Sequence, residues 1–157
     1  MVRDKRALGI DCASRKSGLA VLEGTKLLFH EAYTSMLRPH YSDRELAHEL
    51  NLFRRRVSKL VNEYDIDITV VEFTAGFRNH QTSRMLSYFE AAAIMGASSK
   101  SKIMRAQTVK ARRDAFGKGY TDKQKVIAKS RSVYGKDLTE DEAEAIVFAL
   151  AGIKQLS

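Results

Sequence analysis

The order of the predicted strands and helices constrains the fold of this chain more than any single motif does. Three short apolar segments, 6–11, 17–24 and 25–34, follow one another after brief turn signals and predict an antiparallel meander of strands. Beyond them the pattern predicts a helix, a strand, a helix, a weaker strand and then further helices. We therefore expect an α/β fold in which a mixed five-stranded sheet is flanked by helices.

The later elements carry clear local signals. Ser42 and Glu45 match a capping box, and apolar residues then recur at helical spacing until about Tyr64. Thr139 and Glu142 can form a second capping box at the start of the last helix. The run 65–73, "DIDITVVEF", is rich in β-branched residues and predicts a buried strand. The remaining elements are expected at about 80–96 (helix), 101–108 (weak strand), 107–115 (helical turns), 122–135 (basic helix) and from 139 onward (last helix).

Connection rules predict how these strands pair. A right-handed crossover from the third strand brings the strand at 65–73 beside the strand at 6–11. Asp11 and Glu72 stand at the ends of these two strands. The sequence therefore predicts that the two carboxylates lie next to each other at one edge of the sheet.

Length and composition limit the class of protein. The 157 residues, 44% of them apolar, are enough for a single domain spanning 1–157 with a real core. The single cysteine, Cys12, excludes an internal disulfide and a cysteine-based zinc cluster. There is no apolar run of membrane-spanning length and no signal-peptide pattern, so we expect a cytoplasmic protein without a membrane partner.

The positive charge, formally +8, is concentrated in one part of the chain. Ten lysines and arginines lie between Lys100 and Lys136, against only Asp114 and Asp122. A basic region of this kind suits a polyanion such as nucleic acid. The alternative is a solvated surface that keeps the protein soluble.

Acidic residues gather at the start of the last predicted helix. Glu140, Asp141 and Glu142 stand in its first turn, where the helix dipole alone favours negative charge. Glu144 lies beyond that turn and shares a face with Asp141, and Phe148 continues the face with an apolar contact. We therefore expect Asp141 and Glu144 to point toward the core.

Buried carboxylates are costly unless a cation pairs with them. A divalent cation would offset this cost for Asp11, Glu72, Asp141 and Glu144, because Mg²⁺ prefers oxygen ligands and leaves positions open for water and phosphate. Two such ions about 3.5–4 Å apart can hold the attacking water and the leaving oxygen of a phosphodiester. The pattern thus indicates a metal-dependent catalytic site within a basic surface.

Four segments together resemble the RuvC-type Holliday junction resolvases, which have an RNase H-like fold. They are "LGIDCASRKSGLAVL" (8–22), "VVEFTAGFRN" (70–79), "VKARRDAFGKGYTDKQKV" (109–126) and "DEAEAIVFAL" (141–150). Each is similar to one motif of that family, in the same order. Glu144 stands where bacterial members usually have Asp, and Ala75 where they have a junction-probing aromatic residue. The resemblance is therefore to a divergent member, such as a phage-encoded one.

The resemblance implies roles for individual residues. Asp11, Glu72, Asp141 and Glu144 correspond to the metal ligands, with two Mg²⁺ ions per site and Mn²⁺ able to substitute. Lys110 and Lys123 match catalytic basic residues near the scissile phosphate. Further nucleic-acid contacts are expected from Ser14, Arg15, Phe73, Phe77, Arg78, Arg112, Arg113 and Lys118.

The implied activity is a structure-selective endonuclease that resolves four-way DNA junctions by paired symmetric nicks. Two nicks need two sites, so a homodimer is expected. Its candidate interface is the helix at 80–96, where Ala91, Ala92, Ala93 and Gly96 permit close approach and Met85 and Phe89 supply apolar area. These side chains could instead pack only on the chain's own sheet. The setting would be a bacterial cell or a phage-infected host, and no small-molecule substrate is expected.

Other functions fit parts of the pattern. A different RNase H-like nuclease, acting on RNA or an RNA–DNA hybrid, would use the same acids. A catalytically inactive nucleic-acid-binding module would explain the basic residues but has no need for four acids. Actin-like ATPases begin with a similar strand, but they need a second domain that 157 residues do not accommodate.

Overall fold

The computed structural model describes residues 2–73 and 80–157 of the chain. Within them, five strands form one sheet in the order β3-β2-β1-β4-β5. The strands are β1 (Arg6–Asp11), β2 (Lys16–Glu23), β3 (Lys26–Thr34), β4 (Ile68–Glu72) and β5 (Lys102–Ala106). The first three strands are antiparallel neighbours, and β1, β4 and β5 run parallel. The predicted mixed sheet, with β4 beside β1, is confirmed.

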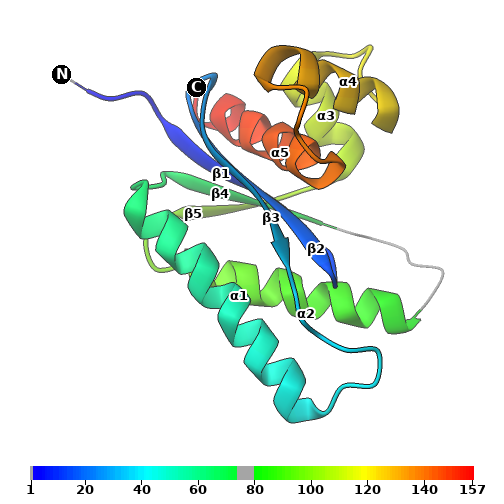
Figure 1. Cartoon of the computed structure of the whole chain (residues 1–157). Coiled ribbons are helices and arrows are strands. Elements are labelled where there is room, and N and C mark those ends of the chain that lie inside the picture. The colour runs from blue at the N-terminus through cyan, green and yellow to red at the C-terminus, as the bar shows by residue number, and fades with distance from the viewer. Residues whose placement is uncertain (1, 74–79) are drawn as a thin grey trace.

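Helices cover both faces of this sheet, which gives three layers (Figure 1). The helices α1 (Asp43–Glu63) and α2 (His80–Ala97) lie on one face. The other face carries α3 (Thr108–Phe116), α4 (Lys123–Tyr134) and α5 (Glu140–Leu156). Each face has its own apolar cluster, centred on Phe53 and Phe89 under α1 and α2 and on Ile146 and Phe148 of α5.

Local signals at the helix ends match the expectations from sequence. The Ser42 hydroxyl accepts a hydrogen bond from the backbone N–H of Glu45 at the start of α1. Thr139 and Glu142 form a complete capping box at the start of α5. Strand β5 ends at Ala106 rather than Thr108, because Gln107 is already the N-cap of α3.

The apolar face of α2 is used within the chain. Phe89, Ala92 and Ala93 are buried, and Phe89 meets Phe53 of α1 edge-on with ring centroids 5.5 Å apart. A Cβ at Gly96 would lie 2.4 Å from the backbone oxygen of Arg54, so α1 and α2 approach closely at this point. These side chains therefore pack in the core instead of forming the expected intermolecular surface. From Arg84 onward, the exposed residues of α2 are Arg84, Ser87, Tyr88, Ala91 and Met95, and of these Tyr88, Ala91 and Met95 form a stripe along one side of the helix.

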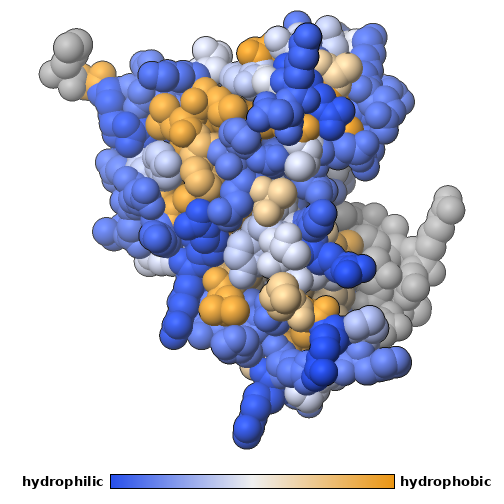
Figure 2. All heavy atoms as spheres, viewed as in Figure 1, coloured by the Kyte–Doolittle hydropathy of each residue, from blue (hydrophilic) through white to orange (hydrophobic). Residues whose placement is uncertain are grey.

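The surface is mostly hydrophilic on the face shown in Figure 2, with separate small apolar patches. Met36 and Met95 are among the most exposed large apolar side chains. None of the described helices is both long and apolar enough to cross a membrane.

Candidate active site

Two parallel strands place the first pair of acids. Ile10 of β1 is paired with Val71 of β4, so the next residues, Asp11 and Glu72, end the two strands side by side. A hydrogen-bonding interaction with Glu72 is one of the smaller causes that raise the pKa of Asp11. The Thr108 hydroxyl, at the start of α3, donates a hydrogen bond of 2.6 Å to Oε1 of Glu72. The predicted neighbourhood of Asp11 and Glu72 is thus present.

Helix α5 brings the second pair of acids over the ends of these strands. A Cβ at Gly9 or at Gly18 would lie 1.9 Å from a backbone oxygen of α5, that of Ala145 or of Asp141 respectively. Only glycine permits this close approach of helix to sheet. Asp141 is half-buried and Glu144 is buried, as the shared helix face predicts.

All four predicted acids line one small cavity. Asp11, Glu72, Asp141 and Glu144 share it with Glu140 and, at its floor, with Phe148. Thr108, Arg112 and Lys123 complete its lining. The cavity therefore combines a group of carboxylates with two cationic side chains.

The carboxylates make ionisation of their neighbours unfavourable. Burial, followed by the negative charges of Glu72, Glu144 and Asp141, raises the pKa of Asp11 well above its ordinary value. Burial also raises the pKa of Asp141, although the positive charge of Lys123 opposes this shift. Such shifts in a cleft are typical of functional sites. A cation placed among these oxygens would remove the repulsion.

Arg112 is the most firmly held cation of the cavity. Its guanidinium forms an ion pair with the carboxylate of Glu144, and the exposed fractions of the two side chains are 12% and 6%. Its Nη1 also donates a 3.0 Å hydrogen bond to the backbone oxygen of Thr121, which ties α3 to the loop before α4. Sequence reasoning placed Arg112 on the nucleic-acid surface, whereas the structure places it inside the acidic cavity.

The two predicted catalytic lysines lie in different places. Lys123, the first residue of α4, lines the cavity with its Nζ 3.6 Å from Oε2 of Glu140. Lys110 is not part of the cavity lining. Its Nζ lies 2.7 Å from Oδ2 of Asp114, one turn further along α3, and it borders a separate groove beside β5. The structure thus brings Lys123, but not Lys110, to the carboxylates.

The expected nucleic-acid contacts are spread around this cavity. Ser14 and Arg15 lie in the turn between β1 and β2, in a hollow that also reaches Asp141. Arg113 and Lys118 are exposed on the α3 side. Phe73 is 44% exposed, with the Arg105 guanidinium carbon 5.3 Å from its ring centroid. Phe77 and Arg78 lie outside the described residues.

Two polar groups of this region were not predicted from sequence. Thr108 carries no motif signal, and its role follows only from the position of the start of α3 beside the end of β4. Arg105 contacts both α2 and the end of β4. Its guanidinium forms a 2.7 Å ion pair with buried Glu90 of α2 and donates a 3.4 Å hydrogen bond to the backbone oxygen of Glu72. Its place on an alternating, weak strand gave no reason to single it out.

The donor set suits a hard divalent cation, because it consists of carboxylate oxygens and the hydroxyl of Thr108. The grouping of Asp11, Glu72, Asp141 and Glu144 in one small cavity supports this fit. Among the residues that the structure describes, no three acidic, histidine or cysteine side chains are grouped as the ligands of one ion. Arg112, bound to Glu144, takes part of the space among the acids.

Comparison with known proteins shows which solved structures share the fold of this chain. No family model and no curated protein matches the sequence. Among solved structures, Thermus thermophilus RuvC in complex with Holliday junction substrate matches with a TM-score of 0.81 and 15% identity, over 97% of this chain and 94% of that chain. This chain has the RuvC fold. A second Thermus thermophilus RuvC structure gives a TM-score of 0.79 and 18% identity, over 96% of this chain and 95% of that one.

A more distant match is the yeast mitochondrial Holliday junction resolvase Ydc2, with a TM-score of 0.57 and 8% identity over 98% of this chain and 80% of that one. At these identities the likeness is one of fold. The expected RNase H-like α/β architecture and the resemblance to RuvC-type proteins are therefore confirmed at the level of structure.

Proposed function

We propose that this protein is a divalent-metal-dependent endonuclease that resolves four-way DNA junctions by paired symmetric nicks. The observation that carries the proposal is the meeting of Asp11, Glu72, Asp141 and Glu144 in one cavity. The RuvC fold supports the substrate, because one solved RuvC structure of that fold is a complex with a Holliday junction.

The proposed chemistry assigns the acids to metal binding. Mg²⁺, or Mn²⁺ in its place, would activate water and stabilise charge on the phosphate, with two ions per site. Asp11, Glu72, Asp141 and Glu144 would hold the metal through their carboxylate oxygens. A cation bound among these oxygens would oppose the shift that burial and the neighbouring acids impose on the pKa of Asp11.

The cations of the cavity would act on the phosphate. Lys123 stands at the cavity edge, 55% exposed, and can reach a phosphate oxygen without leaving a buried partner unpaired. Arg112 is held by Glu144 and Thr121, so its role is to fix the positions of these groups. Exposed Arg15, Arg113 and Lys118 would contact the DNA backbone beyond the site.

Cleavage of three labelled substrates tests the proposal: a four-way junction, its component duplex and an RNA–DNA hybrid of the same sequence. We expect Mg²⁺-dependent nicks at symmetric positions of the junction and much slower cleavage of the duplex. Faster cleavage of the hybrid would instead identify an RNase H-like nuclease acting on RNA. Binding without cleavage of any substrate would leave an inactive nucleic-acid-binding module.

We also propose that the protein acts as a homodimer, because one chain supplies one acidic cavity and the junction needs two nicks. The exposed stripe of α2 is the candidate interface: Tyr88, Ala91 and Met95 share one helix face, and Met95 is 64% exposed. Sedimentation at micromolar concentration should show a dimer that Met95→Glu weakens. Val133→Glu, an equivalent change on α4, is the matched control. A wild-type monomer that still nicks both strands in concert would contradict the proposal.

A further inference from the structure

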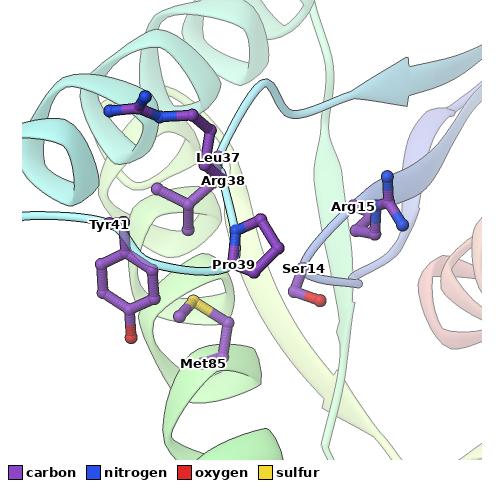
Figure 3. A pocket seen from close by; sticks show the side chains of 7 residues that line it. All are labelled: Ser14, Arg15, Leu37, Arg38, Pro39, Tyr41 and Met85. Carbon is purple, nitrogen blue, oxygen red and sulfur yellow. The ribbon is translucent and has the colours of Figure 1, made fainter.

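A pocket of about 250 Å³ lies beside the acidic cavity, between the β1–β2 turn and the loop that joins β3 to α1. We call it the Tyr41 pocket. Figure 3 shows its lining: Leu37, Arg38, Pro39 and Tyr41 come from the loop, Met85 from α2, and Ser14 and Arg15 from the turn. Its walls are mainly apolar, with one hydroxyl and one guanidinium at the side of the turn.

The pocket continues toward the acids. A second hollow shares Ser14, Arg15, Leu37 and Pro39 with it and extends to Lys16 and Asp141. A phosphodiester polymer with one phosphate at the acidic cavity can therefore lie along Lys16 and Arg15, and a neighbouring side group of that polymer can then enter the Tyr41 pocket. No carboxylate among the described residues pairs with Arg15 or Lys16, so both charges are available to such a chain.

The two walls of the pocket are fastened to each other and to α1. The backbone N–H of Ser35 donates to the backbone oxygen of Arg15 at 2.7 Å, which joins the loop to the turn. Buried Glu49 of α1 accepts hydrogen bonds from the backbone N–H of Met36 at 3.2 Å and from the Ser35 hydroxyl at 3.5 Å. The pocket is thus held open by the fold, which reduces the cost of filling it.

Arg38 takes a different role from Arg15. Its Nη2 and Nε donate to the carboxylate of Glu45 of α1, at 2.7 Å and 3.2 Å. Figure 3 shows its side chain turned away from the pocket, toward that helix. The pocket interior is consequently left to the apolar side chains, the ring of Tyr41 and the thioether of Met85.

We propose that the Tyr41 pocket receives one unstacked nucleobase from the DNA strand whose phosphate lies at the acidic cavity. This proposal rests on the proposed nuclease function. A base is a flat, largely apolar group joined to a phosphodiester, which matches an apolar pocket with cations along its entrance. A branch point supplies such a base at low cost, since unstacking is cheapest where the helix is already interrupted.

A double-mutant cycle between protein and DNA tests the pocket. The wild-type protein and Tyr41→Ala are titrated in EDTA, at fixed salt, with a four-way junction and with versions of it that lack a single base at each position near the nick. We expect Tyr41→Ala to weaken binding of the intact junction about tenfold, as loss of one base–aromatic contact predicts. At one position of each nicked strand, removal of the base should make the wild-type protein and Tyr41→Ala bind the junction with equal affinity.

Three further variants guard the test against misfolding and against general charge effects. Ser14→Phe fills the pocket without removing a core contact and should show the same dependence on one base. Arg15→Gln should weaken binding of all the junctions, while Arg55→Gln, which removes an exposed charge on α1, should have little effect.

The possible outcomes distinguish failure of the proposed base pocket from failure of the proposed nuclease function. If both pocket variants weaken every junction equally, or weaken none, the base pocket is wrong even though the wild-type protein nicks junctions. If the wild-type protein neither prefers nor nicks the junction, the proposed function itself fails. Coupling at one base position, shared by Tyr41→Ala and Ser14→Phe, supports the pocket.

Discussion

Two acidic residues near the start of α5 have opposite surroundings. Glu142 is buried and faces β3, where its carboxylate contacts Nδ1 of His30 and accepts the backbone N–H of Thr139 at 3.0 Å. Burial opposes ionisation of Glu142, but hydrogen bonds from His30 and Thr139 outweigh it and lower its pKa. Asp141, the preceding residue, faces the cavity, where burial raises its pKa.

The difference separates structural acids from candidate catalytic ones. Glu142 has donors from its own chain and stabilises the start of the helix. Asp11 has other carboxylates as neighbours, and these raise its pKa further. Such an unfavourable group of like charges is typical of a functional site in which a cation from solution binds among the carboxylates. Substitution of these acids and of Arg112, Lys110 and Lys123 tests whether the cavity binds such a cation and whether these cationic side chains have separate roles.

The largest effect on stability is expected from Arg112→Ala. This change leaves Glu144 buried without its partner, which should lower the free energy of unfolding by about 3–5 kcal/mol. Urea denaturation measures the loss. The double variant Arg112→Ala/Glu144→Gln should recover much of it, because the uncompensated charge is gone. Equal stability of the single variant and the wild type would show that the pair is not formed in solution.

The two predicted catalytic lysines should separate in a kinetic assay. Lys123→Ala should slow single-turnover cleavage at saturating protein by about tenfold or more, since Lys123 borders the cavity. Lys110→Ala should leave that rate near the wild-type value, because Lys110 pairs with Asp114 outside the cavity. A larger loss for Lys110→Ala would show that α3 turns this lysine toward the phosphate when DNA binds.

A smaller effect is expected on the pH dependence of stability. Because the pKa of Asp11 is raised above its ordinary 3.8 in the folded state, its contribution favours folding at acid pH and is lost as pH rises through the folded-state pKa. Asp11→Asn should therefore melt at a higher temperature than the wild type in EDTA, with a gap that widens as the pH rises above the ordinary pKa of 3.8. Calorimetry measures this. A gap that narrows with rising pH would contradict the assigned cause.

Much of this arrangement could be predicted from the sequence because it depends on local pattern and connection rules. The crossover rule placed Asp11 beside Glu72, and the spacing of Asp141 and Glu144 placed both on the inner face of α5. Capping signals at Ser42 and Thr139 located two helix starts.

The features that the sequence did not predict depend on how elements pack against one another. Helix α3 has basic residues on several sides, so only its position over α5 decides that Arg112 turns inward while Lys110 stays outside. The small residues of α2 suited an interface or a core equally well. The close approach of α1 at Gly96 and the burial of Ala92 and Ala93 assign these three to the core, while Ala91 stays exposed.

The most direct test compares cavity acids with Glu142 in one cleavage assay. Asp11→Asn, Glu72→Gln and the control Glu142→Gln are each incubated, at saturating protein and with Mg²⁺, with a labelled four-way junction. The first two variants should lose on the order of 10³-fold in single-turnover rate while still binding the junction, because Lys and Arg supply the phosphate contacts. Glu142→Gln should cleave at a rate close to that of the wild type. Cleavage by Asp11→Asn or Glu72→Gln at a near-normal rate would contradict the assignment of this cavity as the catalytic site.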